Sequence, residues 1–104
     1  MKITEIKIRK FIDHEENNRL RGIISITIDN FLAVHDIKVV QGEQRIFVAM
    51  PSRRDENGVY RDIVHPISAE ARKEMEEQIL EEYTRERDRR DAEIENNEYN
   101  RQNG

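Results

Sequence analysis

Three arginines within one short stretch of this 104-residue chain have side chains well suited to binding phosphate groups. Arg53 and Arg54 are adjacent, and Arg61 follows shortly after them. A guanidinium presents a planar fork of N–H donors that matches two phosphate oxygens at once. A phosphate contact is therefore one hypothesis for these residues. Carboxylates stand directly after both groups of arginine, so composition alone favours the other interpretation, a salt-bridged turn exposed to solvent.

The sequence around these arginines predicts two short strands joined by a polar turn. Residues 47–50 favour a strand, and Pro51 ends it because proline has no N–H to donate to a sheet. Asn57-Gly58 is typical of a tight turn with positive φ, and a second strand is expected over residues 59–64. The arginine pair is thus expected on a loop held by a rigid scaffold, with the third arginine just behind it.

Four more basic residues can extend the predicted contact. Arg19 and Arg21 begin a neighbouring predicted strand, and Arg72 and Lys73 lie in the first turns of a predicted helix. Only two aromatic residues lie nearby, which gives little support to a surface that stacks single-stranded bases.

The front of the chain has the pattern of short β-strands. Isoleucines alternate with charged residues over 2–11 and with small or polar residues over 20–28, which is the period of half-buried strands. A third strand is expected over 32–40. With the two strands around the arginines this makes about five, and links this short join antiparallel neighbours.

A helix is predicted after the strands. Ser68 is suited to cap its N-terminus, and Ala71, Met75, Ile79 and Tyr83 fall on one stripe of a helical wheel, wide enough to cover a sheet. The fold class is therefore predicted as α+β, with an antiparallel sheet of about five strands and a C-terminal helix packed on or beside it.

Residues 1–83 are predicted to form the folded domain, and residues 84–104 a charged extension that is either a helical arm or disordered. Past Tyr83 the stripe positions are charged, so the packed part of the helix is expected to end there. Glu81–Arg85 and Glu86–Arg90 are expected as i,i+4 ion pairs, each contributing about 0.2–0.5 kcal/mol.

The formal net charge of −4 comes from the C-terminal part of the chain. Residues 1–67 hold 11 Lys and Arg against 10 Asp and Glu, whereas residues 68–104 hold 7 against 12. This balance does not exclude a nucleic-acid partner for the front of the chain, and it gives no strong basic signal for one.

The residue pattern gives no indication of catalysis, a metal site or a cofactor. The chain has no cysteine, which excludes disulfides and thiolate ligands, and it has no Gly-rich phosphate loop. His14, His35 and His65 lack the spacing of metal ligands. His14 is expected at the surface, and the other two are expected as hydrogen-bonded structural residues. We therefore expect no enzyme activity, no metal, no cofactor and no small-molecule substrate.

The sequence also lacks signals for a membrane. No apolar run approaches the roughly 18 residues needed to span a bilayer, and the N-terminus lacks the continuous apolar region of a signal peptide. The expectation is a cytoplasmic protein without a membrane partner.

Four separated segments carry a more specific pattern. They are Ser25-Ile-Thr-Ile-Asp-Asn30, Val34-His-Asp-Ile-Lys-Val39, Phe47-Val-Ala-Met-Pro-Ser-Arg-Arg54 and Arg61-Asp-Ile-Val-His-Pro-Ile67. In this order and spacing they resemble the bacterial stage V sporulation protein G (SpoVG) family of septation regulators, over about residues 1–83.

The resemblance implies a small α+β domain that forms a homodimer and binds nucleic acid as a regulator linked to septation, sporulation and gene expression, with no established enzymatic activity. The nucleic-acid-binding residues are predicted to be Arg53, Arg54, Arg61, Arg72 and Lys73, contacting DNA, RNA or both. The acid-rich helix departs from the family pattern. The alternative is a protein-interaction module of the division or transcription machinery that does not bind nucleic acid directly.

Overall fold

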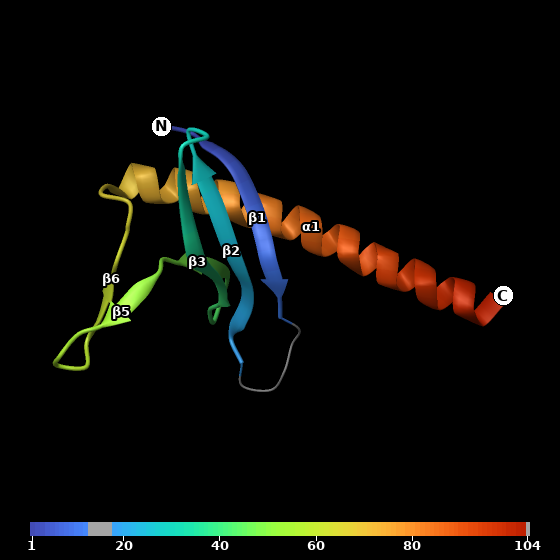
Figure 1. Ribbon diagram of the computed structural model, residues 1–104. Helices are drawn as coiled ribbons and strands as arrows, with labels where there is room; N and C mark the ends of the chain where they lie inside the picture. The colour runs from blue at the N-terminus through green and yellow to red at the C-terminus, as the bar shows by residue number, and fades with distance from the viewer. Residues whose placement is uncertain (13–17, 104) are drawn as a thin grey trace.

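The computed structural model describes residues 1–12 and 18–103, and there it shows a four-stranded antiparallel sheet, a two-stranded ribbon and one long helix (Figure 1). The main sheet has the order β1 (Ile3–Phe11), β2 (Leu20–Ile28), β3 (Leu32–Gln41), β4 (Ile46–Ala49). The ribbon pairs β5 (Ser52–Arg54) with β6 (Tyr60–Asp62), and the helix is α1 (Ala69–Asn103). The predicted α+β class is confirmed.

The predicted fifth strand is present as β6, but it pairs with β5 outside the main sheet. Pro51 separates β5 from β4, as expected for a residue that cannot donate to a ladder. Its carbonyl oxygen accepts a hydrogen bond from the Ile63 N–H at 2.8 Å. The chain therefore leaves the sheet at Pro51 and pairs with itself, which makes the ribbon that projects from the body in Figure 1.

The sheet has one face under the helix and one open face, and a β-bulge in β1 decides which residues lie on each. The pairing of β1 with β2 shifts by one residue between Ile8 and Lys10. Ile8 and Phe11 pair with β2 residues on the helix-covered face, and Lys10 pairs with one on the open face. An extra residue in one strand reverses the alternation that follows it. Arg9 and Lys10 thus both belong to the open face.

A second bulge interrupts β3, where His35 and Asp36 lie between the residues that pair with Ile26 and Ile24. Asp36 has a φ of 63°, a left-handed conformation that Asp tolerates better than most residues. Ser25 Oγ lies 2.8 Å from His35 Nδ1 and accepts a bond from Arg9 Nε at 3.3 Å. The prediction that His35 is a hydrogen-bonded structural residue is confirmed.

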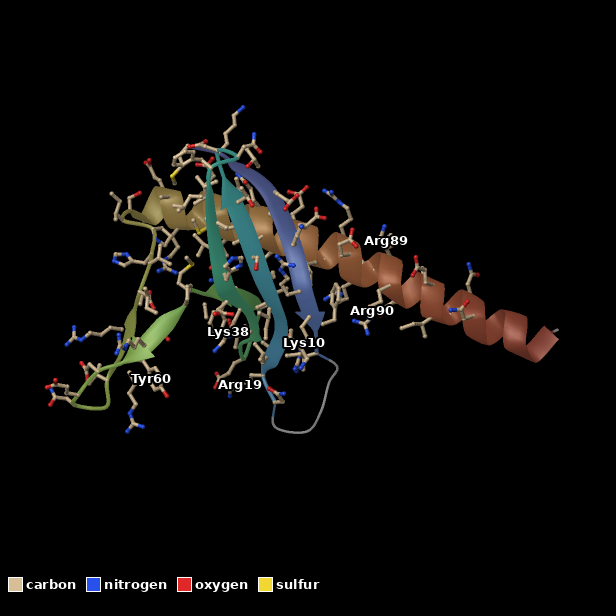
Figure 2. All side chains as sticks on the ribbon, in the orientation of Figure 1. Lys10, Arg19, Lys38, Tyr60, Arg89 and Arg90 are labelled. Carbon is tan, nitrogen blue, oxygen red and sulfur yellow. The ribbon has the colours of Figure 1, made fainter. Side chains whose placement is uncertain are left out.

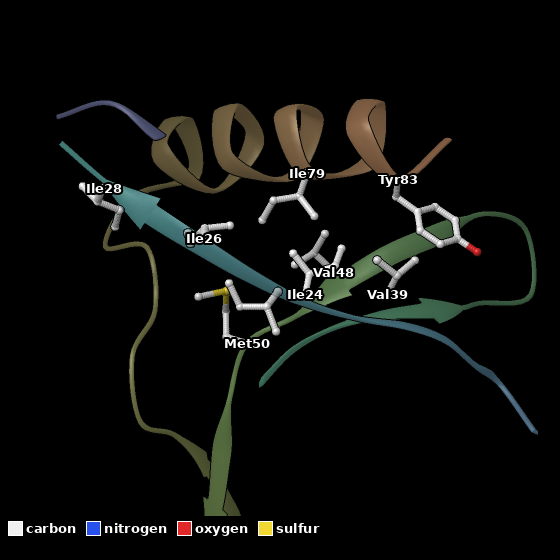
Figure 3. Packing of buried hydrophobic residues seen from close by; sticks show 9 residues of the cluster. Ile24, Ile26, Ile28, Val39, Val48, Met50, Ile79 and Tyr83 are labelled. Atoms are coloured by element: carbon white, nitrogen blue, oxygen red, sulfur yellow. The ribbon is translucent and has the colours of Figure 1, made fainter. Parts of the chain in front are cut away.

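The core lies between the sheet and the first four turns of α1 (Figure 3). Ser68 Oγ accepts a hydrogen bond from the Ala71 N–H at 3.1 Å, which confirms the predicted cap. Ile79 and Tyr83 are buried, and Ala71 and Met75 are half-buried, so the predicted stripe is also confirmed. The buried apolar residues are Ile24, Ile26, Ile28, Ile37, Val39, Val48, Met50, Ile79 and Tyr83.

Tyr83 approaches the sheet where Gly22 leaves room for its ring. A Cβ at Gly22 would lie 3.3 Å from the Tyr83 ring, a tighter contact than ordinary packing allows. Phe11 also stacks on Tyr83, with ring centroids 5.7 Å apart and an interplanar angle of 30°. This aromatic pair fixes the point at which the helix crosses the end of β1.

The helix continues past Tyr83 to Asn103, and Arg90 on this part of it still contacts Phe11 of β1. The ion pair Glu81–Arg85 is present at 3.4 Å, as predicted. The predicted pair Glu86–Arg90 is wrong, because Glu86 binds Arg89 at 2.6 Å while the Arg90 guanidinium lies 5.0 Å over the Phe11 ring. The division into residues 1–83 and 84–104 stays a prediction.

Two other expectations concern histidines and membranes. His65 is exposed, and its Nδ1–H donates to the Pro66 carbonyl oxygen at 2.9 Å; His14 lies outside the described residues.

Within residues 1–12 and 18–103 no three potential ligands gather where they could hold a metal ion. No helix in that part of the chain has the length and apolar character needed to cross a bilayer.

Candidate nucleic-acid interface

Arg53 and Arg54 lie on strand β5 rather than on the loop predicted for them. Pairing with β6 places Arg53 opposite Arg61 and Arg54 opposite Tyr60. Residues directly opposite in an antiparallel pair share a face, and neighbours along one strand alternate. The ribbon therefore presents Arg53 and Arg61 on one side, and Arg54 with Tyr60, labelled in Figure 2, on the other.

The two arginines on the shared face have different surroundings. The Arg61 guanidinium donates from Nε to Asp55 Oδ2 at 2.9 Å. Arg53 makes no ion pair with any residue that the structure describes, although it stands directly opposite another cation. Like charges at this position destabilise a strand pair. The opposed cations therefore favour binding of an anion to this face of the ribbon.

The third arginine lies against the turn of the ribbon. Gly58 has a φ of +81°, as predicted for the Asn57-Gly58 pair, and a Cβ there would lie 3.2 Å from Arg54 Nη2. The left-handed backbone favours glycine here, and a larger residue would also make the nearby guanidinium shift slightly.

Asp55 has a structural task that the sequence pattern did not suggest. Its Oδ1 accepts bonds from the N–H groups of Asn57 at 2.9 Å and Val59 at 3.0 Å, and its Oδ2 accepts from Arg61. A side chain that bonds to backbone groups further along the chain is the usual way in which Asp closes a turn. The carboxylate beside the arginines therefore holds the loop, and it engages only one of the three guanidiniums.

We predict that the turn of the ribbon loosens in acid. The hydrogen bond from Arg61, followed by that from Val59, holds the pKa of Asp55 below its ordinary value. A pKa that is lower in the folded state than in the unfolded state stabilises the turn at pH values above the unfolded-state pKa of about 3.9. This stabilisation is lost as the pH falls through the folded-state pKa. The amide signals of Asn57 and Val59 in an NMR pH titration should report this change below about pH 4.

The matched control for this prediction is Asp55→Asn. Its amide oxygen can still accept from both N–H groups but has no charge to titrate. The turn signals of this variant should stay constant over the same acid range. Equal titration of these signals in both proteins would show that another group controls the turn.

Arg72 and Lys73 are not brought to the ribbon. They line a separate hollow of about 430 Å³ between the first turns of α1 and the loop before β4, together with Arg45 and Leu80. Arg45 is held there by Glu76 at 2.6 Å. No ion pair or hydrogen bond among the described residues joins this hollow to the ribbon arginines. The five predicted contact residues thus form two groups rather than one.

A basic row on the open face of the sheet was missed by sequence reasoning. Lys10, Ile23 and Lys38 are direct neighbours across β1, β2 and β3, so the two lysines flank one isoleucine. Figure 2 shows both lysines at the same end of the sheet, with exposed Arg19 beside them. Simple alternation would have placed Lys10 on the opposite face, so only the bulge reveals it.

Arg21, which was expected to extend the patch, does not. It is half-buried, lies on the helix-covered side and donates from Nη1 to the Asn18 carbonyl oxygen at 2.6 Å. Arg19 and Arg21 are two residues apart, but the pairing of β2 with β3 shifts between Leu20 and Gly22. Arg21 lies within this irregularity and so departs from the simple alternation of β2.

An apolar groove of about 370 Å³ lies at the opposite end of the core, where the chain enters the helix. Ile67 lines it and is 91% exposed. Other apolar lining residues are Ile3, Ile28, Leu32, Val64 and Met75. Apolar surface of this kind marks an interaction site more often than scattered exposed residues do.

Comparison of the sequence with known proteins finds a matching family model and several similar proteins. A family model described as SpoVG matches residues 1–85. Relatives named "Putative septation protein SpoVG" are 48% identical in Agathobacter rectalis and 47% identical in Desulforudis audaxviator and in Clostridioides difficile, each over 83 residues. These alignments cover 80% of this chain and 92%, 91% and 87% of the respective relatives. The similarity spans the sheet, the ribbon and the helix as far as the aromatic contact.

Proposed function

Because this chain belongs to the SpoVG family, we propose that it regulates septation by binding nucleic acid, as a homodimer and without catalytic activity. The septation role is taken from the names of its relatives. Nucleic-acid binding rests on the side chains of this chain. The ribbon arginines Arg53, Arg54 and Arg61 are the proposed phosphate contacts.

The observation that carries the proposal is the pairing of Arg53 with Arg61 on one face of a projecting ribbon. Cations on directly opposed residues repel each other, and Asp55 pairs with Arg61 alone. Phosphate oxygens accept bidentate bonds from guanidinium forks, and half or more of protein–DNA hydrogen bonds go to phosphate and sugar. A nucleic-acid backbone would therefore supply a counter-charge for Arg53, which has none among the described residues.

The open face of the sheet supports the same assignment. Lys10 and Lys38 add positive charge there, with Arg19 at the edge. The acid-rich helix covers the other face, so its negative charge is directed away from this row. Separation of charge between two faces steers an anionic partner to one of them. Arg72 and Lys73, on the helix, remain proposed as a second, weaker contact.

The salt dependence of binding tests both the phosphate contacts and the dimer. Each phosphate neutralised on duplex DNA contributes about −0.9 to the slope of log affinity against log salt. Three arginines per subunit predict a slope of about −5 for a dimer and about −3 for a monomer. The measurement is fluorescence anisotropy with labelled duplex and single-stranded DNA and RNA from 50 to 200 mM salt. A slope near zero with every probe would contradict the proposal.

The second candidate function is a protein-interaction module without direct nucleic-acid binding, and the apolar groove favours it. Ile67→Glu would place a charge in the groove without touching the ribbon. If this function is correct, a specific protein should be recovered after nuclease treatment and lost with the Ile67→Glu variant, while the wild-type protein retards no DNA or RNA.

A further inference from the structure

A small hollow lined by three arginines lies where the middle of α1 crosses the end of the sheet. Its volume is about 140 Å³, several times the roughly 30 Å³ that one water takes up in the liquid. Arg21, Arg87 and Arg90 contribute three guanidiniums, and Asp91 is the one lining carboxylate among the described residues. The other lining residues are Phe11, Ile12, Gln41, Ile46, Tyr83 and Ile94. The hollow therefore has a net charge of about two positive units.

Arg21 has a buried donor that nothing in the described chain satisfies. Its Nη1 donates to the backbone carbonyl oxygens of Asn18 at 2.6 Å and Leu20 at 3.3 Å. Its Nε is buried and has no hydrogen-bond partner among residues 1–12 and 18–103. A buried N–H without an acceptor is costly, and in native proteins such a group usually has a partner. An oxygen of a bound group would supply the missing acceptor.

The guanidiniums of the other two arginines lie over aromatic rings. The Arg87 guanidinium carbon lies 5.7 Å from the centroid of Tyr83, and that of Arg90 lies 5.0 Å from the centroid of Phe11. Stacking uses the flat face of a guanidinium and leaves its N–H edge available. Arg90 has no ion pair among the described residues, and Arg87 has only a 3.4 Å contact with Asp88. Two pre-positioned forks thus border the hollow.

Tyr83 adds a hydroxyl at the wall of the same hollow. Figure 3 shows this hydroxyl pointing away from the aliphatic core. Burial raises the pKa of Tyr83, against the opposing effect of the Arg87 and Arg21 charges. The hydroxyl is therefore protonated at neutral pH and available as a donor.

We propose that this hollow binds a phosphate group, with Arg21, Arg87 and Arg90 as its ligands. Arginine forks, a hydroxyl donor and few carboxylates suit a tetrahedral anion that accepts several hydrogen bonds. The phosphate can belong to a small molecule with a phosphate monoester or to the backbone of a nucleic acid. The site is separate from the β5–β6 ribbon, and binding of a free anion there does not depend on the proposed function.

The test is an NMR titration of the full chain with inorganic phosphate at constant ionic strength, with sodium chloride as the compensating salt. The Nε–Hε signals of Arg21, Arg87 and Arg90 should shift together and reach saturation. Arg90→Gln, at an exposed position, should weaken phosphate binding about tenfold or more through loss of a charge-assisted contact. Arg21→Gln should do the same and remove the buried donor. Arg21→Lys, which keeps the charge but not the fork, should restore only part of the affinity.

Arg89→Gln is the matched control, because Arg89 is on the same helix but binds Glu86 and does not line the hollow. This variant should bind phosphate as the wild type does. The proposal is overturned if phosphate causes no saturable shift, or if Arg89→Gln weakens binding as much as Arg90→Gln. Backbone spectra of each variant show whether it is folded. If Arg21→Gln is unfolded, the phosphate affinity of Arg90→Gln decides the test.

A second titration identifies the source of the phosphate. A short oligonucleotide is added with and without a 5′-phosphate, using a protein in which Arg53 and Arg54 are alanine. Shifts that require the 5′-phosphate indicate a monoester ligand, and equal shifts with both oligonucleotides indicate a backbone diester. Because the ribbon arginines are absent, failure of the proposed nucleic-acid contact at the ribbon leaves this result unchanged.

Discussion

Replacing Arg53 and Arg54 together by alanine is expected to lower nucleic-acid affinity about a hundredfold at 50 mM salt. In a dimer the change removes four of six proposed phosphate contacts, so the salt slope should fall from about −5 to about −2. Both side chains are exposed, and neither has an ion pair among the described residues. Their loss should therefore leave stability within about 0.5 kcal/mol of the wild type. Fluorescence anisotropy against salt measures both quantities.

The matched control is Arg85→Ala with Arg89→Ala, which changes the net charge by the same amount on the helix. Arg85 and Arg89 bind Glu81, Glu82 and Glu86 and lie far along the chain from the ribbon. Equal losses in both double variants would mean that overall charge, not the ribbon, controls binding. Full affinity and an unchanged slope in the ribbon variant would refute the proposed contact.

Replacing Ile79 by alanine is expected to lower the free energy of unfolding by about 2–5 kcal/mol. Among the helix residues whose side chains are described, 69–97, Ile79 alone has no exposed surface, and Figure 3 shows it above the isoleucines of β2. Removing three carbon atoms there leaves a cavity, because the close-packed sheet can relax only partly to fill it. Urea unfolding followed by circular dichroism gives the change, which corresponds to a melting temperature lower by about 10 °C or more.

Ile94→Ala is the control on the same helix, since Ile94 is 47% exposed and lies outside the core cluster. The chemical change and the gain in helix propensity are identical at the two positions. Its effect should stay within about 0.5 kcal/mol. A similarly small effect at Ile79 would show that α1 contributes little to the fold.

The strands and the helix were predictable because their signals are local. Over 20–28 the alternation of isoleucine with smaller residues specifies a half-buried strand, and β2 has these bounds. The helix stripe from Ala71 to Tyr83 depends only on helical spacing, and Ser68 caps the helix through a bond three residues along. Propensity, capping and periodicity act within a few residues, so a single sequence contains them.

The candidate site was predictable only in part. The clustering of the arginines raised the hypothesis of a phosphate contact, which stays a prediction, and Asn57-Gly58 indicated the turn that lies beside them. The pairing of Arg53 with Arg61 depends on β5, whose three residues have no strand signal of their own. The separation of Arg72 and Lys73 from the ribbon depends on where the helix begins relative to the sheet. Neither property can be read from a short stretch of sequence.

By itself the sequence determined the α+β class, the order of the strands, the buried stripe of the helix and the arginine cluster at residues 53–61. Tertiary structure decided which face each basic residue occupies. The bulge in β1 moves Lys10 to the open face and returns Phe11 to the helix, where Tyr83 meets it, and the bulge in β3 places Lys38 on the open face. A shift of one residue in pairing reverses every side chain beyond it, and that shift is selected by packing against the helix. The basic row and the arginine-lined hollow therefore exist only in the folded chain.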